Sequence, residues 1–198
     1  SVINNSAKWG ITGYKKEKYS NKIFHFIYQQ TVAEGQMGGF FLDLDDPCSP
    51  ENPWIGKKVS VIIKENQVEL QLYGDTLKGN VGGTGYLVKE GNYFENGKTY
   101  DITFGMYDVS ETAVRVILTV DGENLFDEVV EDTAFVSAES NFCITTGNGG
   151  VAVIVGSSTD DENVIDLTPL ISDEANWVSN NTEAVPVFEN GTMSVINN

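Results

Sequence analysis

The sequence predicts an all-β fold, a two-sheet antiparallel β-sandwich of the jelly-roll type, and three observations support this. Several short segments alternate between apolar and polar side chains, which is the period of a strand with one buried face. Turn signals built from Gly, Asn and Asp recur about every 8–12 residues, as in sandwiches and jelly rolls. No segment has the periodicity of a long amphipathic helix, and "TPLISDEANW" offers one short helical turn at most.

The individual strands can be predicted in order along the chain. In "NKIFHFIYQQTV", the rings of Phe24, Phe26 and Tyr28 share one face. "GGFFLDLD" predicts the next strand, and residues 59–63 and 68–73 predict a hairpin around "KEN". "KTYDITFGMYDV" and "TAVRVILTVDGENLFDEVV" predict three more, since Asp-Gly between alternating apolar runs is a strong hairpin signal. With "SNFCITTG", "VAVIVGSS" and the tail, about nine to eleven strands are expected.

The charge of the chain excludes several classes of partner. Its 198 residues carry 29 acidic and 12 basic side chains, a net charge of −17. Such a surface repels phosphate backbones and anionic lipid surfaces, so neither nucleic acid nor a membrane is an expected partner. No stretch approaches the roughly 18 apolar residues that a membrane-spanning helix needs. We expect a protein that is extracellular or on the cell surface.

The two cysteines leave one question open. Cys48 and Cys143 could form one disulfide or could be separate buried thiols. The chain has no CxxC motif and a single histidine, so zinc is not expected.

The pentapeptide SVINN occurs at residues 1–5 and again at residues 194–198. This predicts a tandem repeat of whole domains. We expect one β-sandwich over residues 1–198, with a linker at residues 157–163. Residues 164–198 would be the start of the next repeat, docking as strands on the same sandwich or on a neighbouring copy.

A resemblance to a known family follows from these segments. "FENGTMSVINN", joined to "SAKWGITGYKKEKYSNKIFHFIYQQ", resembles the opening of bacterial concanavalin A-like (laminin G-like) jelly rolls. Residues 59–73 resemble the central hairpin of that family, and "YDITFGMYDVSETAVRVILTVDGENLFDEVVED" resembles its most typical stretch. The resemblance implies a module of a secreted or cell-surface protein, often a carbohydrate-binding or adhesive unit.

The carboxylates do not follow the pattern of glycosidases with this fold. A glycosidase needs two carboxylates about 5–10 Å apart across the scissile bond. The laminarinase-type enzymes carry them as Glu-x-Asp-x-x-Glu or Glu-x-Asp-x-Glu on one strand, and this sequence has no such run. We therefore expect a non-catalytic carbohydrate-binding module. The alternative is an adhesin or surface-layer repeat with a protein partner; a glycoside hydrolase is the less favoured third class.

Aromatic side chains in loops are the candidates for binding a polysaccharide or other glycan. Rings stack on the faces of sugars, and a few polar groups fix the orientation. The irregular, Gly-rich stretch 74–98 is the favoured region, because long loops on a rigid scaffold often carry function. The candidate rings, each of which could instead pack in the core, are Trp54, Tyr86, Tyr93, Phe94 and Tyr107.

A calcium site is expected where "DLDDPCSPEN" leaves a strand. Asp43 and Asp45 share one strand face and Asp46 begins the loop. Calcium takes six to eight oxygen ligands, commonly from carboxylates in loops. The alternative is an acidic turn that binds no ion.

Overall fold

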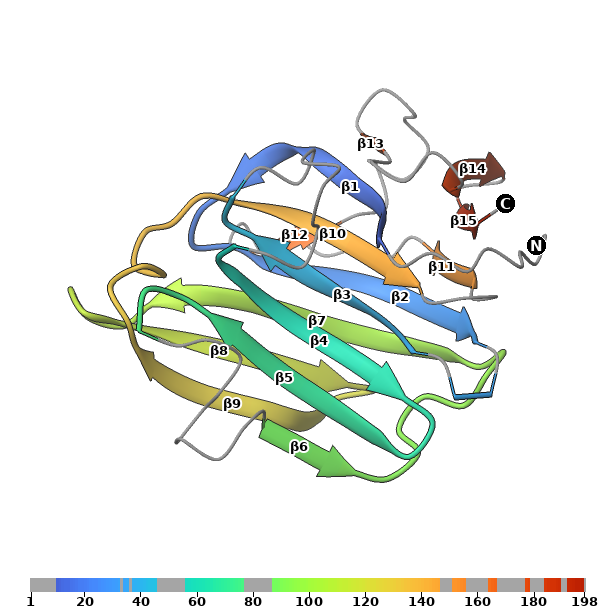
Figure 1. Ribbon diagram of the computed structural model, residues 1–198, viewed down its shortest axis with the longest axis horizontal. Helices are drawn as coiled ribbons and strands as arrows, with labels where there is room; N and C mark the ends of the chain where they lie inside the picture. Colours follow the sequence, from blue (N-terminus) through green and yellow to red (C-terminus); the bar gives the residue numbers. More distant parts are fainter. Residues whose placement is uncertain are drawn as a thin grey trace.

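The protein folds into two β-sheets stacked face to face (Figure 1). A computed structural model describes residues 10–32, 34–35, 37–45, 56–76, 87–146, 151–155, 164–166, 177–178, 184–189 and 192–197. Within these residues every regular element is a strand. No helix among them is long and apolar enough to cross a membrane. The predicted fold class, an all-β antiparallel sandwich, is confirmed.

Seven strands form the first sheet, which we call sheet I. Its order is β13 (Trp177–Val178), β1 (Gly10–Tyr19), β10 (Ser140–Thr146), β3 (Gly38–Asp43), β4 (Lys58–Lys64), β5 (Gln67–Tyr73) and β6 (Leu87–Glu90). Each of these strands runs antiparallel to its neighbours in the sheet.

Eight strands are grouped in the second sheet, sheet II. Along its path lie β14 (Ala184–Glu189), β15 (Thr192–Asn197), β11 (Val151–Val155), β2 (Ile23–Thr31), β7 (Thr99–Asp108), β8 (Ala113–Val120) and β9 (Glu123–Glu131). The short strand β12 (Val164–Asp166) pairs with the first part of β2 and is parallel to it.

The core lies between the sheets and is rich in aromatic rings. The predicted alternation in β2 is confirmed, because Phe24, Phe26 and Tyr28 are at most 1% exposed while the residues between them are partly exposed. The rings of Phe26 and Phe40 meet edge to face across the two sheets, with centroids 5.1 Å apart. Such pairs add to the stabilisation from burial alone.

The hairpin between β8 and β9 turns where the sequence predicts. Asp121 (φ 51°) and Gly122 (φ 81°) both adopt left-handed backbone conformations. A two-residue turn of this kind matches the right-handed twist of the flanking strands, and Asp-Gly adopts it at low steric cost.

Two features of the fold were not predicted from the sequence. Residues 10–19 form β1, although this segment shows no regular alternation. Its register against β10 shifts twice, between Ile11 and Gly13 and between Tyr14 and Lys18. Such irregularities interrupt the period of two that identifies a strand. In addition, β10 and β11 follow one another in the sequence but belong to different sheets.

Strands from the C-terminal part complete both sheets. The antiparallel hairpin of β14 and β15 pairs with β11, and β13 pairs with β1 at Tyr14 and Lys15. The expected linker, residues 157–163, and most of the short helical turn expected at 168–177 lie outside the described residues. So does Cys48, while Cys143 is buried and its thiol donates to the carbonyl of Asn141 at 3.5 Å.

Candidate functional site

Residues 91–98, which connect β6 to β7, are held firmly against the ends of the sandwich. The N–H of Gly91 donates to the carbonyl of Asn66, at 2.8 Å, in the turn between β4 and β5. The side-chain amide of Asn96 pairs with both backbone groups of Val32, donating at 2.9 Å and accepting at 3.1 Å. The segment therefore contacts both sheets. It belongs to the predicted loop 74–98, of which residues 87–90 form β6 instead and residues 77–86 lie outside the described part.

A hollow of about 530 Å³ lies beside this segment, and we call it the tyrosine hollow. Its lining comes from β6 of sheet I, from residues 92 and 93, and from β7 and the β8–β9 turn of sheet II. Its lining combines two aromatic rings with amides and carboxylates: Tyr93, Tyr100, Asn92, Asn124, Asp121 and Glu123. This is the composition expected of a site for a hydroxyl-rich ligand.

The position of the Tyr93 ring depends on a glycine. Gly91 has φ +136°, a conformation that L-residues with a side chain rarely adopt. A Cβ added there would lie 3.1 Å from Cε2 of Tyr93, so the ring packs over the glycine backbone. The other ring of the hollow is fixed as well, because the hydroxyl of Tyr100 accepts from the N–H of Glu95 at 2.8 Å.

The turn on the opposite side of the hollow is also held in place. The N–H of Asp121 donates to the carbonyl of Asp101 at 2.8 Å, and the N–H of Asp101 donates to Oδ1 of Asp121 at 2.7 Å. These reciprocal bonds join the β8–β9 turn to β7. The walls of the tyrosine hollow are therefore formed before any ligand binds.

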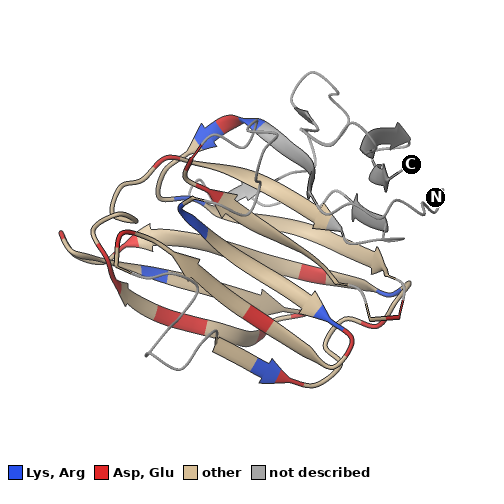
Figure 2. Ribbon diagram, in the orientation of Figure 1, with Lys and Arg blue, Asp and Glu red and all other residues tan. Residues whose placement is uncertain are grey.

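A second hollow, of about 400 Å³, lies on the other side of the same segment, and Asn92 lines both. Its charged residues are Glu34, Glu65, Glu95 and Lys64. The charged residues that line the tyrosine hollow are Lys89, Asp121 and Glu123. Both hollows thus carry more carboxylates than amines. Figure 2 shows acidic residues along β9, and basic residues on β6 and at the end of β4.

The structure separates the predicted ring residues. Tyr93 lines the tyrosine hollow. Phe94 is 3% exposed, and its ring packs against Tyr28 and Tyr100 with centroid distances of 6.1 and 5.0 Å; it lines the second hollow and not the tyrosine hollow. Tyr107 lies on β7 opposite Arg115 and does not line either hollow. Trp54 and Tyr86 lie outside the described residues.

Several lining residues were missed by sequence reasoning. The sequence pattern places Tyr100 in a strand and places Asp121 and Asn124 in a hairpin turn, so none of them was a candidate for the site. The one useful signal was the hairpin prediction itself, because it places this turn at an end of the sandwich. The sequence did not show which loop would lie beside it.

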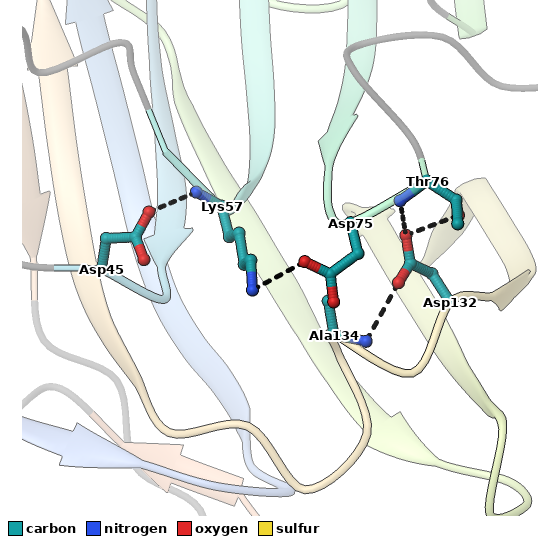
Figure 3. Close-up of polar contacts among 6 residues, drawn as sticks. All are labelled: Asp45, Lys57, Asp75, Thr76, Asp132 and Ala134. Atoms are coloured by element: carbon teal, nitrogen blue, oxygen red, sulfur yellow. Dashed lines mark hydrogen bonds and ion pairs between the residues drawn. The ribbon is translucent and has the colours of Figure 1, made fainter.

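Two of the three expected calcium ligands, Asp43 and Asp45, lie in a turn held by backbone donors. Asp43 is 3% exposed, and its Oδ1 accepts from the N–H of Asp45 at 2.9 Å. Oδ2 of Asp45 accepts from the N–H of Lys57 at 2.5 Å (Figure 3). Lys58 lies opposite Asp43, and an ammonium group there disfavours a second cation. Asp46 lies outside the described residues, and within them no group of three or more potential ligands occurs.

The face of sheet I that points away from the core carries buried polar side chains. Burial lowers the pKa of Lys58, and the negative charge of Asp43 opposes this shift. Glu69 accepts from Lys64 Nζ at 2.5 Å and from Gln71 Nε2 at 2.8 Å. Lys64 and Glu69 join β4 to β5, and Lys58 lies opposite Asp43 of β3, so these contacts stabilise the pairing of the three strands, whereas Gln71 and Glu69 both lie on β5.

Comparison with known proteins gives structural but no sequence matches. No protein-family model matches the sequence, and no curated protein matches it. Among solved structures, the carbohydrate recognition domain of Emp46p in its potassium-bound form is 12% identical, with a TM-score of 0.51, over 71% of this chain and 73% of that one. A β-glucanase of Bacillus licheniformis is 13% identical, with a TM-score of 0.46, over 69% and 57%. An alginate lyase from Chlorella virus is 13% identical, with a TM-score of 0.41, over 77% and 89%. The chain matches little more than half the length of the glucanase.

These likenesses correct one expectation from the sequence. We expected the chain not to be an enzyme, because it lacks the carboxylate strand of laminarinase-type glycosidases. The similar structures include a glycosidic hydrolase, β-glucanases and an alginate lyase, and this overturns that expectation, since the same fold carries enzymes. What the likeness shows of this chain is its fold, the concanavalin A-like jelly roll.

Proposed function

We propose that this protein recognises neutral glycans through the tyrosine hollow. The observation that carries the proposal is the pairing of two tyrosine rings with amide and carboxylate groups in one preformed hollow at the end of the sandwich. Rings of this kind stack on sugar faces, and the polar groups bond hydroxyls. The Emp46p domain, which is named as a carbohydrate recognition domain, has the same fold and supports the same class of ligand.

The charge of the site favours a neutral ligand over an anionic one. Asp121 and Glu123 outnumber Lys89 in the hollow, and the chain as a whole has a net charge of −17. A uronate or sulfated polymer would be repelled by the net charge of the chain at long range and by the carboxylates of the hollow at short range. The setting that suits such a protein is extracellular or on the cell surface, where polysaccharides are the abundant hydroxyl-rich polymers.

Calorimetric titration with neutral and anionic oligosaccharides tests the proposal. We expect binding of a neutral class, and we expect Tyr93→Ala to weaken it at least tenfold, which corresponds to about 1.4 kcal/mol. Tyr107→Ala is the matched control, because it removes the same ring from a position outside both hollows. Equal losses in the two variants, or preferential binding of the anionic sugars, would contradict the assignment.

The same mixtures reveal whether the bound glycan is also processed. Release of reducing ends, measured after the titration, would indicate hydrolysis, and unsaturated products would indicate elimination. If no sugar of either class produces heat with the wild-type chain, the proposal fails and the adhesin alternative, with a protein partner, gains support.

A further inference from the structure

The edge of sheet II at β11 is completed by a separate hairpin. Strand β15 pairs with β11 from Val151 opposite Ile196 to Val155 opposite Thr192, and β14 covers the outer side of β15. Without this hairpin, the edge of β11 away from β2 would present unpaired peptide groups. Such an edge is a template for another strand.

The hydrogen bonds of β11 can be assigned from its neighbour β2. The carbonyl of Gln30 accepts from the N–H of Gly97 at 2.9 Å, so the peptide groups of Gln30 face the β7 side. In an antiparallel ladder the N–H and C=O of one residue point the same way, and bonded pairs alternate with non-bonded pairs. Ala152, opposite Gln30, therefore turns its peptide groups away from β2 and toward Val195 of β15.

A proline agrees with this assignment independently. Val195 lies between Ala152 on one side and Pro186 of β14 on the other. If Val195 forms backbone hydrogen bonds with Ala152, then Val195 and Pro186 are a non-hydrogen-bonded pair. The position where the proline lacks an N–H therefore faces outward. Proline is tolerated in just this position, on the outer side of an edge strand. The hairpin therefore has one side that pairs and one side that ends the sheet.

Part of the strand that pairs with β11 has a second copy in the sequence. Residues 194–197 of β15 belong to the SVINN segment that also forms residues 1–5. Suppose that two copies were joined so that residues 194–198 of the first served as residues 1–5 of the second. The hairpin of the first copy would then directly precede residue 6 of the second copy. The same hairpin would lie within reach of the β11 edge of either copy.

We propose that the β11 edge is a strand-acceptor site for the Ala184–Asn197 hairpin of a second copy of this chain, so that copies join head to tail. Pairing along an exposed edge supplies affinity through main-chain hydrogen bonds. The net charge of −17 on each copy opposes the approach of two copies, so the exchange requires salt that screens this repulsion. The inference is independent of glycan binding.

A proline variant tests the acceptor site. Val195→Pro removes the N–H that faces Ala152 and leaves the edge open, whereas Val195→Ala keeps the N–H and serves as the control. A fluorescent synthetic peptide of residues 182–198 is titrated into both full-length variants in 0.5 M NaCl. We expect saturable one-to-one binding to the proline variant, a rise of its melting temperature, and at least tenfold weaker binding to the alanine variant. Absence of binding to a folded proline variant, or equal binding of a peptide that itself carries Val195→Pro, overturns the proposal.

A second measurement covers the case in which the proline variant does not fold. Unlabelled and ¹⁵N-labelled wild-type chains are mixed at high concentration in 0.5 M salt, diluted, and examined by native mass spectrometry. Mixed dimers are the expected species, and the unlabelled 182–198 peptide should reduce them. Monomers alone at every concentration would mean that the hairpin serves only its own chain, and the proposal would be wrong.

Discussion

Asp132 joins two elements that are far apart in the sequence, and its replacement gives a sharp test of the fold. Its Oδ2 accepts from the N–H of Thr76 at 3.0 Å and from the hydroxyl of Thr76 at 2.8 Å (Figure 3). Its Oδ1 accepts from the N–H of Ala134 at 2.9 Å. The side chain is 4% exposed, so the carboxylate fixes the end of β5 to the loop after β9 from a buried position.

The cost of removing this carboxylate follows from its three donors. A hydrogen bond to a charged group contributes about 1.5–3 kcal/mol, and a buried donor left without a partner costs about 1–3 kcal/mol. Because the three bonds share one carboxylate, they are not additive, and we expect Asp132→Ala to lower the free energy of unfolding by about 3–5 kcal/mol. Asp132→Asn keeps one acceptor oxygen and should lose about half as much.

Urea denaturation followed by far-UV circular dichroism measures both variants. Asp75→Ala is the control within the same cluster, since Asp75 is exposed and forms an ion pair with Lys57 at 2.8 Å (Figure 3). Exposed pairs contribute little, so this variant should unfold like the wild type. If Asp132→Ala unfolds at the same urea concentration as Asp75→Ala, the three-donor account of Asp132 is refuted.

Three further predictions concern the site, the pH dependence and metal. Gly91→Ala should weaken glycan binding at least fivefold, because a side chain is strained at φ +136° and the new Cβ would shift the Tyr93 ring by a few tenths of an ångström; unchanged calorimetric affinity would contradict this. Burial favours the neutral acid at Asp108, but hydrogen bonds from Ser137 and Asn21 outweigh it and hold its pKa below the ordinary 3.8. Its contribution to stability is present above pH 3.8 and is lost as the pH falls through the lower folded pKa, so in acid melts Asp108→Asn should lose less stability than the wild type below pH 3.8. A calcium chelator should leave the melting temperature unchanged, and a fall of several degrees would support the predicted calcium site.

The parts of the fold that the sequence predicted are those with local causes. Strand β2 was predictable because its apolar face repeats every second residue over nine residues. The β8–β9 hairpin was predictable because Asp121 and Gly122 suit its left-handed turn. Strand β1 was not, since its two register shifts break the period. The assignment of β10 and β11 to different sheets depends on partners distant in sequence, which no local pattern reports.

The candidate site shows the same division. An aromatic pair in a Gly-rich stretch indicated the right segment, but not which ring was accessible. Tyr93 and Phe94 are neighbours, yet Tyr93 lines the tyrosine hollow, whereas Phe94 packs on Tyr28 and lines the second hollow. The orientation of the pair depends on Gly91 and on the contacts of residues 91–98 with both sheets. Tyr100 and Asp121 join the site because the two sheet edges meet there, and that is a property of the assembled sandwich.

The positions of the tyrosine hollow and of the acceptor edge lead to one more prediction. In sheet II the hairpin lies at one edge and β9 lies at the other, next to the hollow. Head-to-tail joining through β11 would therefore leave every hollow uncovered. Two sites that engage one polymer then combine through their effective concentration, and the gain in affinity can reach about 10²–10⁴. A protein of two linked copies should bind a long neutral polysaccharide at least a hundredfold more tightly than one copy does, yet bind a short oligosaccharide with the single-copy affinity per site. Surface plasmon resonance measures both. An equal gain for the short sugar would place the ligand between the copies, and no gain for the polymer would mean that the two hollows cannot engage one chain together.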